Sequence, residues 1–288
     1  MSSETWTVLK IIQWTTEYLK GKGIENPRLN SEVLLTHLLK LDRVGLYLNY
    51  DRPLSKEELS SFREIVKRRG AREPLQYITG HQEFWSLDFK VTPDVLIPRP
   101  ETEILVEEAV KVIRGQWPGA SESRPPIILD LCTGSGCIAI SLAHELKDAV
   151  VYAVDASDAA LSIARENSER HGVKDRVIFL SGDLYKAMEN RPLTTDHRPL
   201  LFNFVVSNPP YVKSGDIPNI QPEVRDYEPR IAVDGGQEGL DFYKKIVSGA
   251  LQYLLPGGCL MVEVGEGQAA AVSGMMKETG SFEPVSTV

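Results

Sequence analysis

The feature that most constrains the fold is a regular alternation of short apolar runs and helical segments from Ile127 onwards. Five apolar runs have the length of strands: residues 127–131, 150–154, 177–180, 202–206 and 258–264. Segments with the pattern of helices lie between them, at residues 138–146, 159–171 and 241–255. Strands that alternate with helices usually pair in parallel. The sequence therefore predicts an α/β fold with a doubly wound, mostly parallel sheet.

Four polar or small residues stand where these runs end. Gly134, Asp155, Asp183 and Asn208 follow the first four predicted strands. Parallel strands finish at the same edge of a sheet, and open α/β sheets bind their ligands at that edge. We therefore expect these four residues to converge on one ligand site.

The turn after the first strand is rich in glycine. Its residues are Cys132, Thr133, Gly134, Ser135 and Gly136, and Gly134 to Ala139 fit the pattern G-x-G-x-x-A. Glycines let the backbone approach a ligand, and the helix that follows attracts a pyrophosphate or a carboxylate at its N-terminus. Asp155 can accept hydrogen bonds from both ribose hydroxyls. These features serve NAD and S-adenosylmethionine alike, so a nicotinamide enzyme and a methyltransferase both stay open at this point.

The fourth strand leads into a stiff corner, Asn208-Pro209-Pro210-Tyr211. Two consecutive prolines continue neither a sheet ladder nor a helix, and Pro209 keeps the backbone of Asn208 extended. The Asn208 amide, the Pro209 carbonyl and the Tyr211 ring together can hold a planar NH₂ group. The alternative is a proline-rich turn with a capping Asn. Methyl transfer to an amide or amino nitrogen needs such a corner, whereas hydride transfer does not.

The rest of the chain divides into three parts. Residues 1–72 have helical patterns without obvious chemistry, and residues 73–97 contain an aromatic, alternating stretch that predicts a β-hairpin connector. Residues 98–288 form the predicted catalytic domain, with a helix that begins at Glu101 or Thr102. The chain ends at Val288 inside what looks like a sixth strand, and we expect the terminal strand that would pair with it to be missing.

Charge and composition limit the partners. The net charge of −8 is unevenly distributed, because residues 91–288 contain 28 Asp or Glu but only 18 Lys or Arg. This region is a poor match for a nucleic-acid backbone. No apolar run approaches the roughly 20 residues that span a bilayer, and the polar N-terminus has no signal peptide. We therefore expect a cytoplasmic protein that contacts neither nucleic acid nor membrane. Cys132 and Cys137 could be a metal pair, but no further His or Cys clusters near them, so the sequence predicts that these two and Cys259 are reduced thiols and that there is no metal site.

Taken together, the motifs resemble a known family. Residues 130–136, Asp155 and the Asn208 corner look like class I S-adenosylmethionine-dependent methyltransferases that methylate planar NH₂ groups. Three further stretches, residues 72–80, 97–103 and 234–240, resemble the PrmC/HemK family. Members of this family methylate N5 of the glutamine in the Gly-Gly-Gln motif of class I peptide chain release factors. The resemblance covers nearly the whole chain and implies a Rossmann-like methyltransferase whose helical N-terminal domain docks the substrate. We expect the protein to be a monomer.

The resemblance also assigns roles to residues. It implies that the cofactor, S-adenosylmethionine, is bound by Cys132, Thr133, Gly134, Ser135, Gly136, Asp155, Asp183, Leu184 and Asn208. The substrate glutamine would be bound by Asn208, Pro209, Pro210 and Tyr211, with Asn208, Pro209 and Tyr211 in catalytic roles. Cys132 stands where many members have glycine, and Leu184 where some have Trp.

Two other functions fit parts of this pattern. An adenine-N6 nucleic-acid methyltransferase uses the same corner, because adenine also presents a planar NH₂ group. A release-factor or ribosome-binding module that only retains cofactor affinity is a non-enzymatic alternative. The acidic catalytic region argues against the first, and the intact corner argues against the second.

Overall fold

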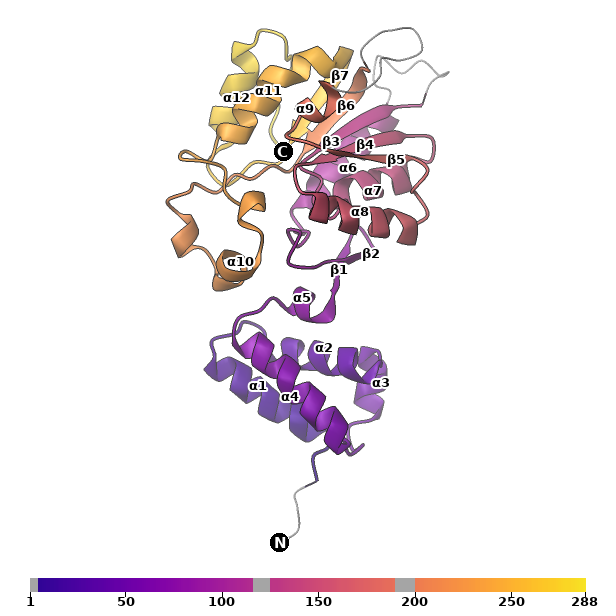
Figure 1. Ribbon diagram of the computed structural model, residues 1–288, viewed down its shortest axis with the longest axis vertical. Coiled ribbons are helices and arrows are strands. Elements are labelled where there is room, and N and C mark those ends of the chain that lie inside the picture. Colours follow the sequence, from indigo (N-terminus) through magenta and orange to yellow (C-terminus); the bar gives the residue numbers. More distant parts are fainter. Residues whose placement is uncertain (1–4, 116–124, 190–199) are drawn as a thin grey trace. The chain divides into compact units, whose positions relative to one another are not determined.

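The computed structural model describes residues 5–115, 125–189 and 200–288, which form two compact units (Figure 1). The helical unit consists of residues 1–80 together with residues 221–227. The sheet unit consists of residues 81–220 and 228–288. The boundary that the sequence suggested at residue 72 falls inside the helical unit, which continues through one more short helix. Within the described ranges, no helix is both long and apolar enough to cross a bilayer.

The helical unit is built from amphipathic helices around one small core. Its helices are α1 Val8–Gly21, α2 Pro27–Leu39, α3 Arg43–Leu48, α4 Lys56–Gly70, α5 Leu75–Thr79 and α10 Pro222–Tyr227. Ser55 and Glu58 form a capping box that starts α4, because each side chain accepts from the other's backbone N–H. Fully buried residues such as Leu34 and Leu46 fill the centre.

The segment that contains α10 belongs to the helical unit through polar contacts. The Glu223 carboxylate accepts hydrogen bonds from Arg69 and Arg72, each at 3.2 Å. The Tyr227 hydroxyl donates to the backbone carbonyl of Ala71 at 2.7 Å. Because Arg69 is buried, Glu223 supplies a carboxylate to a guanidinium that is largely withdrawn from water.

The sheet unit contains a hairpin and a five-stranded parallel sheet. The predicted hairpin is confirmed as β1 His81–Phe84 and β2 Leu87–Lys90. The parallel strands are β3 Ile127–Leu131, β4 Val150–Asp155, β5 Val177–Ser181, β6 Phe202–Ser207 and β7 Leu254–Val262, in the order β5-β4-β3-β6-β7. The chain adds strands outward from β3 to β5 and then returns to the other side of β3. The switch point between β3 and β6 is where such sheets bind ligands.

Helices cover both faces of this sheet (Figure 1). On one face lie α6 Thr102–Arg114, α7 Cys137–Glu145 and α8 Asp158–Arg170, and on the other α9 Lys186–Glu189, α11 Asp241–Tyr253 and α12 Ala269–Glu278. Alternate residues of β3 serve the two cores, Ile128 packing towards α6 and α7 and Leu129 towards α11. Two short 3₁₀ turns, Ile217–Asn219 and Arg230–Ala232, interrupt the segment between β6 and α11.

One expected element does not form. The sequence suggested a sixth strand before Val288, but residues 279–288 contain no strand. Pro284 has no N–H to give to a ladder, and the residues after α12 pair with no strand of the described sheet.

Candidate active site

The register of the sheet brings the two predicted motifs side by side. Leu131 is paired with Val154 on one side and with Ser207 on the other. The glycine turn therefore leaves β3 directly beside the residue that precedes Asn208 and beside the end of β4. Residues 132–136, 155 and 208 thus lie at one edge of the sheet, as the sequence predicted.

Backbone conformation explains the composition of the glycine turn. Gly134 and Gly136 have φ values of 55° and 82°, in the left-handed region that glycine adopts without strain. A Cβ at Gly136 would also come within 3.1 Å of the Ala164 Cβ, so glycine is needed there for close helix packing. Cys132 has φ of 62°, so a residue with a side chain adopts the left-handed conformation here. Thr133 donates its hydroxyl to Asp130 at 2.6 Å, which fastens the turn to β3.

Asp155 holds the same turn from the side. Its carboxylate accepts the N–H of Gly134 at 2.8 Å and the N–H of Ser157 at 2.9 Å. Burial raises the pKa of Asp155, and the backbone N–H groups around it oppose that rise. Each carboxylate oxygen has a second lone pair, so the group can still accept hydroxyl hydrogens from a ligand. Asp155 therefore shapes the turn in addition to the ligand-binding role that the sequence suggested.

The next two predicted residues differ in exposure. The side chain of Asp183 is 42% exposed and pairs with Lys186 at 2.9 Å, and this partner lowers the pKa of Asp183. Leu184 is buried in the core that also contains Leu129 and Val154. Only about 5% of Leu184 is exposed, so a ligand would contact a small part of this residue.

The Asn208 corner is held by side chains from two distant segments. Asn208 is half-buried, while Pro209 and Pro210 are buried. The Asn208 Nδ2 donates to the Thr102 Oγ1 at 3.0 Å, and the Thr102 hydroxyl donates to the Glu263 Oε2 at 2.6 Å. Among the described residues, no donor bonds to the Asn208 Oδ1 or to the Pro209 carbonyl. The corner therefore has two acceptors that are not used within the described chain.

The sequence did not link Thr102 or Glu263 to the Asn208 corner. The family resemblance implied only that residues 98–103, which include Thr102 at the helix start, wall the cofactor pocket. Glu263 lay inside a predicted strand that in fact ends at Val262. The backbone N–H of Glu263 bonds to the Ser207 carbonyl at 3.0 Å, which sets Glu263 beside the corner. Burial raises the pKa of Glu263, with Glu101 adding to the rise and the bonds from Thr102 and Asn208 opposing it.

The backbone after the corner is fixed by a glycine-rich segment. Gln268 donates to the Tyr211 carbonyl at 2.9 Å, and Val212 forms a parallel bridge with Asp234. A Cβ at Gly235 would lie 2.7 Å from the Tyr211 Cα, and one at Gly239 would lie 2.4 Å from the Tyr211 carbonyl oxygen. Residues 234–240, which the sequence singled out by resemblance alone, therefore form the wall behind Tyr211.

Carboxylates dominate the electrostatics of this edge. Asp130 is fully buried, and burial raises its pKa to about 7, opposed by the hydrogen bond from Thr133. Asp155 and Glu263 are further carboxylates at the same strand ends. Arg99, a guanidinium close enough to lower the pKa of Glu263, already pairs with the buried Glu228 at 2.6 Å. Such an edge suits a cationic ligand and disfavours a pyrophosphate, which counts against a nicotinamide cofactor. No group of three His, Cys, Asp or Glu within the described ranges could hold a metal.

Comparison with known proteins gives the family. Residues 10–80 match the family described as PrmC N-terminal domain, and residues 121–223 match the methyltransferase small domain. A protein of Geobacter sulfurreducens named release factor glutamine methyltransferase is 51% identical over 277 residues, which cover 96% of this chain and 90% of that relative. Proteins of the same name from Moorella thermoacetica and Rhodopirellula baltica are 42% and 36% identical, over 92% and 97% of this chain and 87% and 91% of theirs.

Identity at this level along almost the entire chain leaves no large segment unmatched. It extends over both units and over the edge of the sheet where the glycine turn and the Asn208 corner meet. The chain belongs to the release factor glutamine methyltransferase family.

Proposed function

We propose that this protein transfers a methyl group from S-adenosylmethionine to the side-chain amide nitrogen of the glutamine in the Gly-Gly-Gln motif of class I release factors. One observation carries the proposal. The Asn208 Oδ1 and the Pro209 carbonyl are acceptors without donors among the described residues, next to a glycine turn at the switch point of the sheet. Two acceptors match the two hydrogens of a primary amide.

The cofactor fits the residues at this edge. A Cβ at Gly134 would meet no atom within 4 Å, so the turn is open where a ligand would approach. Asp155 has lone pairs left for ribose hydroxyls, and the surrounding carboxylates favour a cation. We assign cofactor binding to the residues that the sequence suggested, namely Cys132, Thr133, Gly134, Ser135, Gly136, Asp155, Asp183, Leu184 and Asn208. When bound, S-adenosylmethionine would supply an electrophilic methyl group on a sulfonium.

The chain's own residues then act on the glutamine. An amide nitrogen is a poor nucleophile because its lone pair is conjugated with the carbonyl. Asn208 and Pro209 each accept one N–H hydrogen, and these bonds strengthen as the nitrogen becomes positive during attack. Tyr211 stacks on the amide plane and, with Pro210, limits its rotation. With S-adenosylmethionine bound, the C–N bond would form as the S–C bond breaks, leaving the neutral thioether, and the glutamine nitrogen would release one proton to water.

The test is methylation of defined substrates by the purified protein. Labelled S-adenosylmethionine is incubated with a class I release factor, with the same factor carrying Ala in place of the motif glutamine, and with DNA. We expect label only in the unmodified factor. Label in DNA would favour the adenine-N6 alternative, and binding of cofactor without label in any substrate would favour a non-catalytic module.

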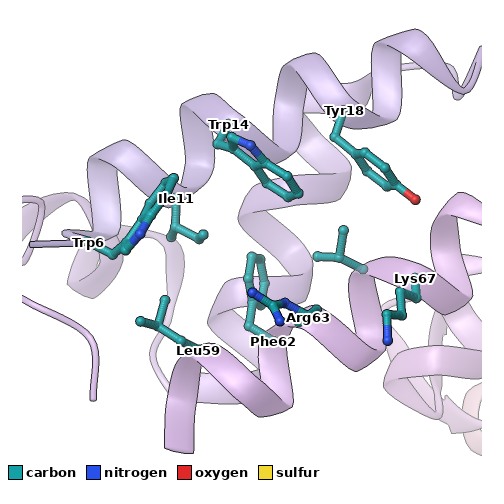
Figure 2. A pocket seen from close by; sticks show the side chains of 9 residues that line it. Trp6, Ile11, Trp14, Tyr18, Leu59, Phe62, Arg63 and Lys67 are labelled. Atoms are coloured by element: carbon teal, nitrogen blue, oxygen red, sulfur yellow. The ribbon is translucent and has the colours of Figure 1, made fainter. Parts of the chain in front are cut away.

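We further propose that the helical unit recognises the release factor. A pocket of about 330 Å³ lies between α1 and α4 (Figure 2). Trp6, Trp14 and Phe62 give it aromatic walls, and Trp14 is 50% exposed. Single exposed apolar residues are common, but an aromatic pocket with an exposed Trp is typical of a binding surface.

Positively charged side chains at the edge of the pocket indicate which kind of partner segment it would bind. Arg63 and Lys67 line it, and no carboxylate in the described part of the chain pairs with Arg63. A partner segment with a large apolar side chain and a neighbouring carboxylate would therefore fit. We propose that such a segment of the release factor, away from its Gly-Gly-Gln motif, occupies this pocket. We expect the reaction to take place in the cytoplasm, with the methyltransferase as a monomer.

A further inference from the structure

The Asn208 side chain can face a ligand in two opposite ways. Its amide has an acceptor oxygen and a donor NH₂ of nearly the same size, and rotation about one bond exchanges them. Only the oxygen can accept a hydrogen from a substrate amide. The NH₂ would instead meet the substrate's own N–H groups, donor against donor. The proposed reaction therefore needs a device that selects one orientation, and the Asn208 backbone alone does not provide it.

The hydrogen bonds around Asn208 supply this selection. An ionised Glu263 has acceptors only, so the single hydroxyl proton of Thr102 is donated to it, over 2.6 Å. The Thr102 oxygen can then only accept, and the group at 3.0 Å from it must be the donor end of Asn208. The Asn208 oxygen is thereby turned away from Thr102.

The two supporting residues are themselves fixed by the fold. Thr102 is the first residue of α6, it is buried, and its N–H bonds to the Arg99 carbonyl. The backbone of Glu263 bonds to the Ser207 carbonyl through its N–H and accepts the Tyr243 hydroxyl at 3.1 Å. The chain of bonds thus joins a helix start and two strand ends, none of which can shift without breaking backbone hydrogen bonds.

We propose that Thr102 and Glu263 are positioning residues that hold the Asn208 amide with its oxygen towards the substrate nitrogen. This inference rests on the proposed function, because the substrate amide gives the orientation its purpose. Neither residue needs to contact substrate or cofactor for this role. The negative charge of Glu263 also polarises the Asn208 amide through these hydrogen bonds, which makes the Asn208 oxygen a stronger acceptor.

Removal of the Thr102 hydroxyl is the first test. Thr102→Val keeps the shape of the side chain and should lower kcat by about tenfold or more, with little change in the KM for the release factor. The reason is that the lost hydrogen bonds connect Asn208 to the charged Glu263 carboxylate. Thr102→Ser retains the hydroxyl and should stay within about threefold of wild type. The matched control is Ser168→Ala in α8. The Ser168 hydroxyl is also buried, but it donates to a backbone carbonyl and not to the Asn208 corner. Equal kcat for Thr102→Val and wild type would overturn the proposal.

A double-mutant cycle separates positioning from general damage. Glu263→Ala removes the acceptor, so Thr102 becomes free to donate to the Asn208 oxygen and to turn the amide round. Its kcat should fall by about tenfold, and Thr102→Val/Glu263→Ala should lose less than the product of the two single losses, because both residues hold the same Asn208 amide. Losses that multiply would show that the residues act independently and would contradict the proposal.

The side-chain NH₂ of Asn208 gives a readout that needs neither cofactor nor substrate. In protein labelled with ¹⁵N-asparagine, its amide signals should move in Thr102→Val and Glu263→Ala but not in Ser168→Ala. Unmoved signals in both variants would refute the proposed bonds. Failure of the proposed function would look different: wild type would then methylate no release factor, while the Asn208 signals would still respond to the two substitutions.

Acidification offers a further readout. Burial raises the pKa of Glu263, so it should take up a proton at a higher pH than an ordinary glutamate does. The groups that face it are Thr102, Asn208, Arg99, Glu101, Cys137, Tyr211 and Tyr243. Neutral Glu263 no longer dictates the direction of the Thr102 bond, so kcat should fall on the acid side. Glu263→Gln should abolish this acid limb, and an unchanged limb in that variant would contradict the role of Glu263.

Discussion

The two units expose very different surfaces. The sheet unit gathers an amide and several carboxylates at the ends of parallel strands, held by hydrogen bonds that leave selected lone pairs unused. The helical unit exposes an aromatic pocket with cations at its rim, and its buried carboxylate, Glu32, is already paired with Arg28 and Arg43. From this difference we infer that the reaction and the recognition of the protein substrate belong to separate units. Changes in the sheet unit should alter the reaction on any substrate, and changes in the pocket should alter only the use of a whole protein substrate.

The largest effect is expected at Asn208. Asn208→Ala removes an acceptor whose bond strengthens in the transition state, so kcat should fall by about 10²–10³-fold on both release factor and a Gly-Gly-Gln peptide. Steady-state kinetics with saturating cofactor measures this. A loss confined to the whole release factor would break the comparison, because it would give the corner a docking role. A wild-type rate would show that the corner is structural.

Asn208→Asp tests whether a hydrogen-bond acceptor at this position is sufficient for the reaction. A carboxylate retains the acceptor but places a second negative charge beside Glu263, and one Thr102 proton cannot serve both groups. We expect a loss of about 10²-fold in kcat and a partial recovery in Asn208→Asp/Glu263→Gln, where one charge is gone. Activity near wild type in Asn208→Asp alone would show that charge at this position is tolerated.

Asp155 is expected to affect cofactor binding and stability together. Asp155→Ala should weaken S-adenosylmethionine by at least about tenfold through the loss of charged hydrogen bonds. It should also lower Tm, because the N–H groups of Gly134 and Ser157 lose their acceptor. Calorimetry and thermal unfolding measure the two effects, with the exposed Asp158→Ala as control. Unchanged affinity would remove Asp155 from the site.

A smaller and more selective effect is expected in the pocket of the helical unit. Trp14→Ala should raise the KM for whole release factor by roughly five- to tenfold, the loss of one interfacial aromatic side chain, and leave kinetics on a short Gly-Gly-Gln peptide unchanged. Arg63→Glu should act in the same direction. Leu48→Ala is the control, since Leu48 is 82% exposed in the same unit and does not line the pocket. Equal losses on protein and peptide would contradict separate roles for the two units.

The last effect is on stability and not on kinetics, and it concerns how the free energy of unfolding depends on pH. The folded pKa of Asp130 is about 7, above its ordinary value of 3.8, because the group is buried. A raised carboxyl pKa means that folding favours the protonated form, so this contribution is present at low pH and is lost as pH rises from about 4 to 7. It amounts to at most roughly 4 kcal/mol. The fall in stability across this range should be shallower in Asp130→Asn, as denaturant unfolding would measure. Parallel curves would contradict it.

Local signals explain why the sheet and the glycine turn could be predicted from the sequence. The periodicity of strands and helices can be recognised from neighbouring residues alone. The positive φ values of Gly134 and Gly136 likewise favour glycine for a local reason. Asp155 was found because it directly ends a strand. The short helices α3 and α5 were missed because six and five residues carry almost no periodicity.

The two residues that hold the Asn208 side chain, Thr102 and Glu263, could not be identified from local sequence patterns. Thr102 lies 106 residues from Asn208 and 161 residues from Glu263, and no local pattern pairs them. Thr102 has the composition of an ordinary helix start, and Glu263 that of a residue at the end of a strand. Only the register of β6 beside β7, together with the position of α6, brings the three side chains together.

The return of residues 221–227 to the helical unit has a consequence for how the chain is made. Most of that unit leaves the ribosome by residue 80, but Glu223 follows only after most of the strands of the sheet unit. Until then Arg69 has Asn30 as a side-chain partner but lacks its carboxylate. The N-terminal helices therefore gain this ion pair only late in synthesis, although they are synthesised first. A fragment that stops near residue 80 would represent an unfinished intermediate of synthesis, and its behaviour would understate the stability of the same helices in the complete protein.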